Sequence, residues 1–404
     1  MNPWDWFKRG GLGLWTCSDV RQAFALLAAV GAFATAFAQE DAVRDSATVQ
    51  QARNAMVKGK GNRTFYPADK FDLSGLPAYR PEGKVSGTLR LWGSNYFTDG
   101  NLGRYWEEGF RRYHPDVSFY FHLTTAAAAI PALITETADI APNRRITWKE
   151  LLGFQRTFGH DPLEVTVVHG SFDVPGWSNA LVVFVNRNNP IGQLTLKQLD
   201  GIYGAERTGG WVGTEWHPEF ARGPEGNIRT WGQLGLTGEW ADKPIRVLGL
   251  NLQYQQATDL SQWLLKGSDK WNERLRMYAN YARRDGSLAI GAKLMVEDIG
   301  RDPYAIGYGS YSYLTPRTKP VALAARDGGP YVMPALETAQ DGTYPLHDEV
   351  FFYVNREPGK PVDPKVREFI RYVLSREGQA QVARDGKYLP LPAAVAKAQL
   401  KKLE

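Results

Sequence analysis

The sequence contains a single cysteine, Cys17, among its 404 residues. A lone cysteine near the amino terminus excludes a framework of intramolecular disulfides and leaves no thiol nucleophile in the rest of the chain. Neither sign of charge strongly exceeds the other, since the formal net charge is only +5 at pH 7. This excess modestly favours anionic ligands and is far too small to indicate a nucleic-acid partner.

Catalytic and metal-binding motifs are also missing. The 6 histidines stand apart from one another, without an H-E-x-x-H motif or another paired spacing, so the sequence predicts no metal site. There is no G-x-S-x-G elbow and no Walker loop. A secreted hydrolase of phosphate esters would need a nucleophile and a base, and no such pair is evident. We therefore predict a protein that is not an enzyme and that carries no cofactor.

Long apolar runs are limited to one segment near the amino terminus. Lys8, Arg9 and Arg21 precede the run "AFALLAAVGAFATAFA", which ends in an A-x-A sequence before polar "QEDAVRD". This order of basic, apolar and small residues is typical of a secretory signal peptide, here residues 1–38, cleaved after Ala38. The run is short for a membrane anchor, which is the alternative. We expect a periplasmic or secreted protein.

A polar segment, residues 39–84, follows the signal peptide. It contains one helix-like piece, "DSATVQQARNAMVKG", and then a stretch rich in proline and glycine. The polar composition predicts a leader that lies on the surface, and removing residues 39–76 is expected to leave folding and ligand binding intact.

Strand-like and helix-like segments alternate from residue 85 onward. "GTLRLWGS" is predicted as a strand, "DGNLGRYWEEGFRRYHP" as a helix with apolar residues at i, i+4 and i+8, and "VSFYFHL" as another strand. The same alternation continues to the end of the chain. It indicates an α/β fold with a largely parallel sheet, and the length of the chain suffices for two lobes.

Three junctions in this series carry candidate anion-binding groups. The strand before Ser94 leads into a helix, where backbone N–H groups and a helix dipole favour an anion. Thr124 and Thr125 stand at a similar junction, although hydroxyl groups there also serve as ordinary helix caps. Arg144 and Arg145 follow a short strand, where they either face a cleft as donors to an oxyanion or lie in solvent.

The order of these segments closely resembles that of the phosphate-binding receptors of ABC importers. The motifs "NPIGQLTLKQLDGIYG" and "LSREGQAQVARDGKYLPLP" carry the resemblance, which spans nearly all of residues 77–400. It implies a type II periplasmic binding protein fold, with two lobes, two hinge-crossing strands near residues 179–183 and 304–308, and one ligand between the lobes. Residues 85–180 and 306–404 would form lobe 1, and residues 181–305 lobe 2.

The loops that the resemblance assigns to the ligand have diverged. The family's G-S-D-T-M loop is here Gly93 to Phe97, so that an aspartate and a threonine are replaced. The family's R-x-x-x-S-G-T loop has Leu250 at the arginine, which removes a fixed charge. The resemblance implies ten ligand-binding residues: Ser94, Asn95, Tyr96, Thr124, Thr125, Arg144, Arg145, Tyr254, Gln255 and Gln256.

The resemblance implies a monomeric receptor that binds phosphate, a related oxyanion or a phosphorylated solute and meets an ABC importer in the membrane. Because a charged contact is missing, we expect phosphate affinity at least about two powers of ten below that of relatives with the full set. The alternative is an interaction or sensor protein of the same fold. In that case Tyr96, Tyr254 and Gln255 would fill the cleft.

Overall fold

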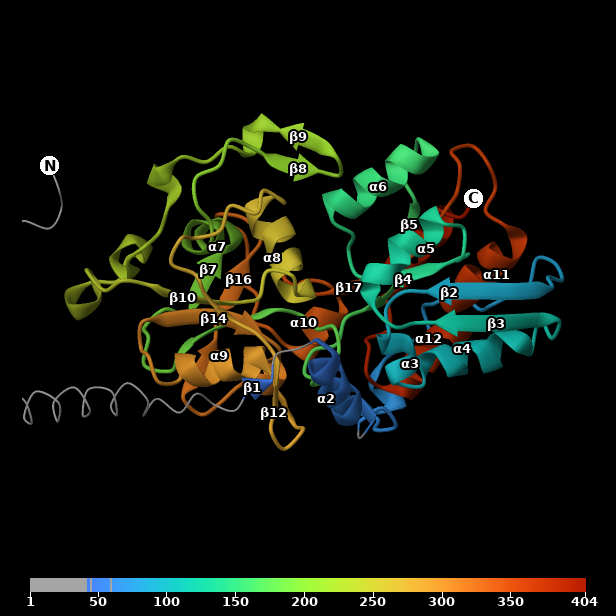
Figure 1. Ribbon diagram of the computed structural model, residues 1–404, viewed down its shortest axis with the longest axis horizontal. Coiled ribbons are helices and arrows are strands. Elements are labelled where there is room, and N and C mark those ends of the chain that lie inside the picture. The colour runs from blue at the N-terminus through green and yellow to red at the C-terminus, as the bar shows by residue number, and fades with distance from the viewer. Residues whose placement is uncertain (1–41, 44–45, 59) are drawn as a thin grey trace, which may run out of the picture.

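The computed structural model describes residues 42–43, 46–58 and 60–404, and Figure 1 shows their arrangement. The predicted signal peptide, residues 1–38, lies outside the described residues. Figure 1 shows two lobes side by side, with helix α2 (Ser46–Lys58) below the gap and strand β17 (Glu349–Val354) on the side of lobe 1 that faces lobe 2. The predicted two-lobed α/β fold is confirmed.

Lobe 1 is built on strands from both the first and the last part of the chain. Strands β2 and β3 are parallel, and β17 pairs antiparallel with both β4 and β5. A bridge between Leu91 and Ile140 joins the two groups of strands. The elements of this lobe are β2 (Gly87–Trp92), α3 (Tyr96–Asp99), α4 (Leu102–Arg111), β3 (Val117–His122), η2 (Ala126–Ala128), α5 (Ala129–Ile134), β4 (Ala141–Asn143), α6 (Trp148–Phe158), β5 (Leu163–His169), β17, α11 (Pro364–Val373), α12 (Arg376–Asp385) and α13 (Ala393–Lys401).

Helix α4 shows why these segments fold as the sequence predicts. Its apolar residues Leu102, Trp106 and Phe110 recur every four positions, so they share one face, and each is at most 2% exposed. The indole of Trp106 donates a hydrogen bond to the carbonyl oxygen of Gly378 in α12, at 2.9 Å. Burial of this face holds α4 against the carboxyl-terminal helices and fixes the wall of lobe 1.

Lobe 2 is built on a five-stranded sheet with the order β11-β10-β14-β6-β15. Strand β14 lies at its centre, parallel to β10 and antiparallel to β6. The elements of this lobe are β6 (Val182–Asn186), β7 (Gln193–Thr195), α7 (Leu196–Tyr203), β8 (Gly210–Val212), β9 (Glu215–His217), η3 (Pro218–Phe220), η4 (Pro224–Gly226), η5 (Trp231–Leu234), η6 (Gly238–Trp240), β10 (Arg246–Leu250), α8 (Gln255–Leu265), β11 (Arg276–Tyr278), β12 (Tyr281–Arg283), β13 (Leu288–Ala289), α9 (Gly291–Ile299), β14 (Ala305–Gly309), η7 (Tyr311–Tyr313), β15 (Thr318–Pro320) and β16 (Ala322–Ala324).

The second connection between the lobes lies later in the chain than the sequence suggested. The predicted crossing at residues 304–308 is strand β14, which pairs inside the sheet of lobe 2. Strands β15 and β16 pair with β6 and β7 of the same lobe, so residues 305–324 belong there and not to lobe 1. The chain returns to lobe 1 through residues 325–348, which include helix α10 (Leu336–Gln340). A strand pattern specifies extended backbone but not the partner strand, which explains the error.

The leader, which the sequence predicted to be packed on the surface or partly mobile, is part of the folded protein. Strand β1 (Ala42–Val43) pairs with β12 of lobe 2, and α2 contacts the adjoining strands β12 and β13. After the short helix η1 (Ala68–Lys70), the leader continues along lobe 1. Side chains of four leader residues are at most 6% exposed: Ala52, Val57, Tyr66 and Leu76. The leader therefore contacts both lobes.

None of the described helices is long and apolar enough to span a membrane.

Candidate functional site

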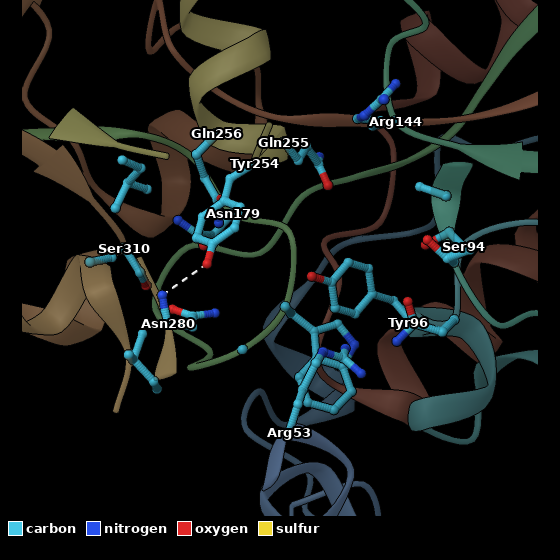
Figure 2. A pocket seen from close by; sticks show the side chains of 18 of the residues that line it. Arg53, Ser94, Tyr96, Arg144, Asn179, Tyr254, Gln255, Gln256, Asn280 and Ser310 are labelled. Atoms are coloured by element: carbon cyan, nitrogen blue, oxygen red, sulfur yellow. Dashed lines mark hydrogen bonds between the residues drawn. The ribbon is translucent and has the colours of Figure 1, made fainter. Parts of the chain in front are cut away.

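A cavity of about 430 Å³ opens between the two lobes, and Figure 2 shows it from close by. Its size is typical of small-ligand sites, which occupy roughly 300–1,000 Å³. Its walls come from lobe 1, lobe 2, the leader and the segment that joins β5 to β6. Eight of the ten predicted binding residues line it: Ser94, Asn95, Tyr96, Thr125, Arg144, Tyr254, Gln255 and Gln256.

The loop after β2 is held in place by a glycine that nothing larger could replace. Gly93 has a φ of +149°, and a Cβ there would lie 2.2 Å from the carbonyl oxygen of Pro142. The next residue, Ser94, donates its backbone N–H to the same carbonyl at 2.8 Å and is buried. This close approach of β2 and β4 brings Ser94, Asn95 and Tyr96 to the cavity.

The two adjacent arginines after β4 point in different directions. The guanidinium of Arg144 lines the cavity and donates to both carboxylate oxygens of Glu150, at 3.0 and 3.4 Å. The guanidinium of Arg145 instead donates to Glu349 at 2.7 Å and lies over the ring of Phe351. The described cavity lining therefore includes Arg144 but not Arg145, although both were predicted to bind the ligand.

Thr124 is also absent from the described lining, although its neighbour Thr125 is present. The hydroxyl oxygen of Thr125 accepts a hydrogen bond from the backbone N–H of Ala127, at 3.4 Å, as a helix cap does. Both threonines are exposed to solvent. Of the two predicted hydroxyl donors at this junction, the structure thus places only Thr125 on the described cavity lining.

The leader supplies a cation that the sequence analysis missed. Arg53 of α2 lines the cavity, donates to Asp99 at 2.8 Å and lies over the ring of Tyr96. Asp99 also accepts a hydrogen bond from the side-chain amide of Asn95. Figure 2 shows Arg53, Tyr96, Ser94 and Arg144 along one side of the cavity. Lobe 1 and the leader together form its cationic wall.

The opposite wall is neutral and rich in amides. Tyr254 precedes helix α8, and its hydroxyl oxygen accepts a hydrogen bond from the backbone N–H of Asn280 at 2.8 Å, drawn dashed in Figure 2. No side chain caps α8, and the first backbone N–H groups of a helix have no partner within the helix. The positive end of α8 therefore faces the cavity at Gln255 and Gln256.

Other residues that line the cavity were absent from the predicted set. Trp177 and Asn179 come from the segment between β5 and β6, and Asn280 and Ser310 come from lobe 2. The buried indole N–H of Trp177 has no partner among the described residues. These positions carry no local motif, so only the folded chain brings them to the ligand cavity. The remaining lining residues are Gln50, Met56, Ala126, Ala127, Gly176, Leu250, Gln253, Leu288, Ile290, Ala292, Gly309 and Tyr313.

Comparison with known proteins agrees with this architecture. The sequence profile of the PBP superfamily domain matches residues 80–377. The phosphate-binding protein PstS of Pseudomonas aeruginosa is 34% identical over 330 residues, which cover 81% of this chain and 90% of that protein. The chain belongs to the PstS family. The resemblance on which the sequence analysis relied is thereby confirmed.

Two further matches are more distant in sequence. The phosphate-binding protein PstS of Staphylococcus aureus is 26% identical over 230 residues, which cover 56% of this chain and 58% of that protein. A crystal structure of PstS from Borrelia burgdorferi aligns with a TM-score of 0.49 at 15% identity, covering 76% of this chain and all of that chain. The Pseudomonas and Staphylococcus relatives are both named phosphate-binding proteins.

Two buried carboxyl groups of this PstS family member, those of Asp259 and Asp348, lie close enough to interact electrostatically. Burial raises the pKa of Asp259 in α8 to about 7, although Arg144 and Arg145 act in the opposite direction. Burial and the negative charge of Asp259 raise the pKa of Asp348 well above its usual range. Protonated carboxyl groups next to the cleft would repel an anionic ligand less than ionised ones.

These raised pKa values predict that stability falls with pH. Between the ordinary carboxyl pKa, about 4, and the folded value of Asp259, about 7, the folded state binds more protons than the unfolded state. Each extra proton lowers the free energy of unfolding by about 1.4 kcal/mol per pH unit in that range. We expect Asp259→Asn to flatten this decline, so that the variant is more stable than the parent protein at pH 8.

Urea unfolding at several pH values between 4 and 8 measures the effect. Asp327→Asn is the control, because the Asp327 side chain is 59% exposed and should leave the pH dependence unchanged. Parallel curves for the parent protein and Asp259→Asn would contradict the assignment.

Proposed function

We propose that the chain is an exported, non-catalytic receptor that binds phosphate, or a phosphorylated solute, in the inter-lobe cavity and delivers it to an ABC importer. The proposal rests on one observation, that two walls of the cavity which both favour an anion face each other. Arg53 and Arg144 supply positive charge on one side, and the uncapped amino terminus of α8 faces them from the other. Both kinds of group favour an oxyanion. Membership of the PstS family supports the same ligand class.

Several details of the proposal come from the sequence and the family. The signal-peptide pattern supports export, with residues 1–38 removed. The lack of a nucleophile and base pair supports a binding role. The family supports a monomer that closes its lobes on the ligand and then meets a membrane complex.

The alternative, an interaction or sensor protein with a filled cleft, has less support. Tyr96, Tyr254 and Gln255 stand on the walls, and a cavity of about 430 Å³ remains between them. The hydroxyl of Tyr254 bonds to the backbone of Asn280, and the amide oxygen of Gln255 accepts from Ser178 at 3.1 Å. These contacts hold both side chains away from the centre of the cavity.

Isothermal titration calorimetry tests the proposal directly. Phosphate, sulfate, a phosphonate and a phosphate monoester are each titrated into the protein that begins at residue 39. The expected result is binding of one equivalent of phosphate or of the monoester. No heat with any of the four anions would reject the proposal and favour the interaction protein.

The lining also predicts weak discrimination between phosphate and sulfate. Phosphate keeps a proton near neutral pH and needs an acceptor for it, whereas sulfate carries none. The described lining contains amide and hydroxyl oxygens but no carboxylate, and Asn95 replaces the aspartate expected from the family's loop. A neutral acceptor contributes on the order of 1 kcal/mol, so the two affinities should differ by no more than about tenfold. A preference for phosphate above about a thousandfold would contradict this prediction.

A further inference from the structure

Three side chains that are far apart in the sequence meet beside the segment that joins the lobes. His169 ends β5 and Glu349 begins β17, where the two residues lie opposite each other in an antiparallel pair. His347 precedes Glu349 by two positions, and its ring centroid lies 5.3 Å from that of His169. One potential ligand atom from each of the three residues lies within 4.8 Å of the other two.

The backbone fixes the orientation of both imidazole rings. Nδ1 of His169 lies 2.9 Å from the carbonyl oxygen of Gln340, and Nδ1 of His347 lies 2.9 Å from that of Tyr344. A carbonyl oxygen only accepts, so both Nδ1 atoms must carry hydrogen and donate it. Each ring then keeps a lone pair on Nε2. Histidines that bind metal ions are typically held in this way, by a hydrogen bond from the other ring nitrogen.

The carboxylate of Glu349 is also oriented by its neighbours. Its Oε2 accepts a hydrogen bond from Arg145 at 2.7 Å, and its Oε1 accepts from the hydroxyl of Thr166 at 3.3 Å. Each carboxylate oxygen has two lone pairs, so both contacts leave acceptor capacity for a metal ion. The guanidinium of Arg145, which the sequence analysis assigned to the anion, therefore positions this carboxylate.

We propose that His169, His347 and Glu349 bind a divalent transition-metal ion, with zinc as the first candidate. Two imidazoles and one carboxylate form a ligand set that zinc accepts, with the fourth tetrahedral position left to water. Zinc ligands at about 2.1 Å lie about 3.4 Å from one another, so small side-chain rotations from the observed arrangement would complete the site. The proposal is independent of the ligand in the cleft.

The position of this zinc site implies a structural effect. His169 and Glu349 belong to the sheet of lobe 1, whereas His347 belongs to residues 325–348, the second connection between the lobes. The adjacent Leu346 accepts a backbone hydrogen bond from Leu181, which lies in the first connection. A bound ion would tie this connecting segment to the lobe 1 sheet and raise the melting temperature.

Calorimetry with zinc chloride and the metal-free protein that begins at residue 39 tests the proposal. We expect one equivalent to bind, and His169→Ala and His347→Ala to weaken the affinity by more than about 100-fold. His217→Ala is the matched control, because His217 lies between Glu215 and Glu219 on lobe 2 and is not one of the three proposed ligands. Loss of binding in this control, or unchanged affinity in both other histidine variants, would overturn the proposal.

The Glu349→Gln variant separates the loss of a metal ligand from misfolding, because glutamine has nearly the same shape as glutamate. Cobalt absorption is recorded for the parent protein and for this variant, together with melting curves in chelator. The proposal predicts a tetrahedral cobalt spectrum that Glu349→Gln weakens, with melting in chelator unchanged. An identical cobalt spectrum in both proteins would overturn it.

Discussion

A protein that lacks residues 39–76 is expected to lose its cooperative unfolding transition. The deletion removes the side chains of Val57, Tyr66 and Leu76, each at most 5% exposed. Burying a large apolar side chain contributes about 1.5–3 kcal/mol, so these three together are worth roughly 5–9 kcal/mol. That sum approaches the whole stability of a typical domain, about 5–15 kcal/mol.

Polar contacts of the leader add to this loss. The hydroxyl of Tyr66 donates to Asp173 at 2.7 Å and accepts from the backbone of Phe172, and its own backbone N–H donates to Gly386. Without Tyr66 these groups would lose partners inside the protein, at a cost of about 1–3 kcal/mol for each group left buried and unpaired. Urea unfolding of the deleted chain and of one that begins at residue 39 measures the difference. Equal midpoints for the two chains would show that the leader is dispensable after all.

Removing both cationic side chains of the cleft is expected to abolish phosphate binding. A hydrogen bond to a charged group contributes about 1.5–3 kcal/mol, so Arg53→Ala and Arg144→Ala should each weaken binding by roughly 10- to 150-fold. The double variant should bind no phosphate at millimolar concentration. Phosphate calorimetry of the three variants measures this.

The acidic partners of these arginines require a control, because Arg144→Ala leaves Glu150 without its cation. Glu150→Gln keeps the capping box of α6, in which Glu150 accepts from Thr147. We expect this change alone to strengthen phosphate binding, because the guanidinium no longer shares its charge with a carboxylate.

Arg145→Ala serves as the matched negative control, since the Arg145 guanidinium bonds to Glu349 outside the described lining. A loss equal to that of Arg144→Ala would mean that the anion lies elsewhere.

The sequence predicted those features that depend on local pattern. Leu102, Trp106 and Phe110 share a face because their spacing matches the helical repeat, and α4 forms where expected. The lobe that contains residues 305–324 could not be predicted in this way, because a strand pattern does not name its partner. The sequence also could not predict to which side the Arg145 side chain points, because adjacent residues after a strand point to different sides.

The cation from the leader was missed for a different reason. The polar composition of residues 39–84 suggested a surface segment, yet Ala52 and Val57 of α2 are buried. Apolar residues on one side of a predicted helix indicate that it docks on the protein, and Arg53 lies next to that side. His169 and His347 gave no such signal, since only the pairing of β5 with β17 and the connecting segment brings them together.

A crystal structure of the protein with bound phosphate tests the central claim most directly. The account predicts one phosphate between the two walls, with oxygen atoms about 2.7–3.0 Å from the guanidinium of Arg53 or Arg144 and from the backbone N–H of Gln255 or Gln256. Lobes closed with Tyr96 against Tyr254 and no anion between them, or phosphate bound outside the cleft, would contradict it.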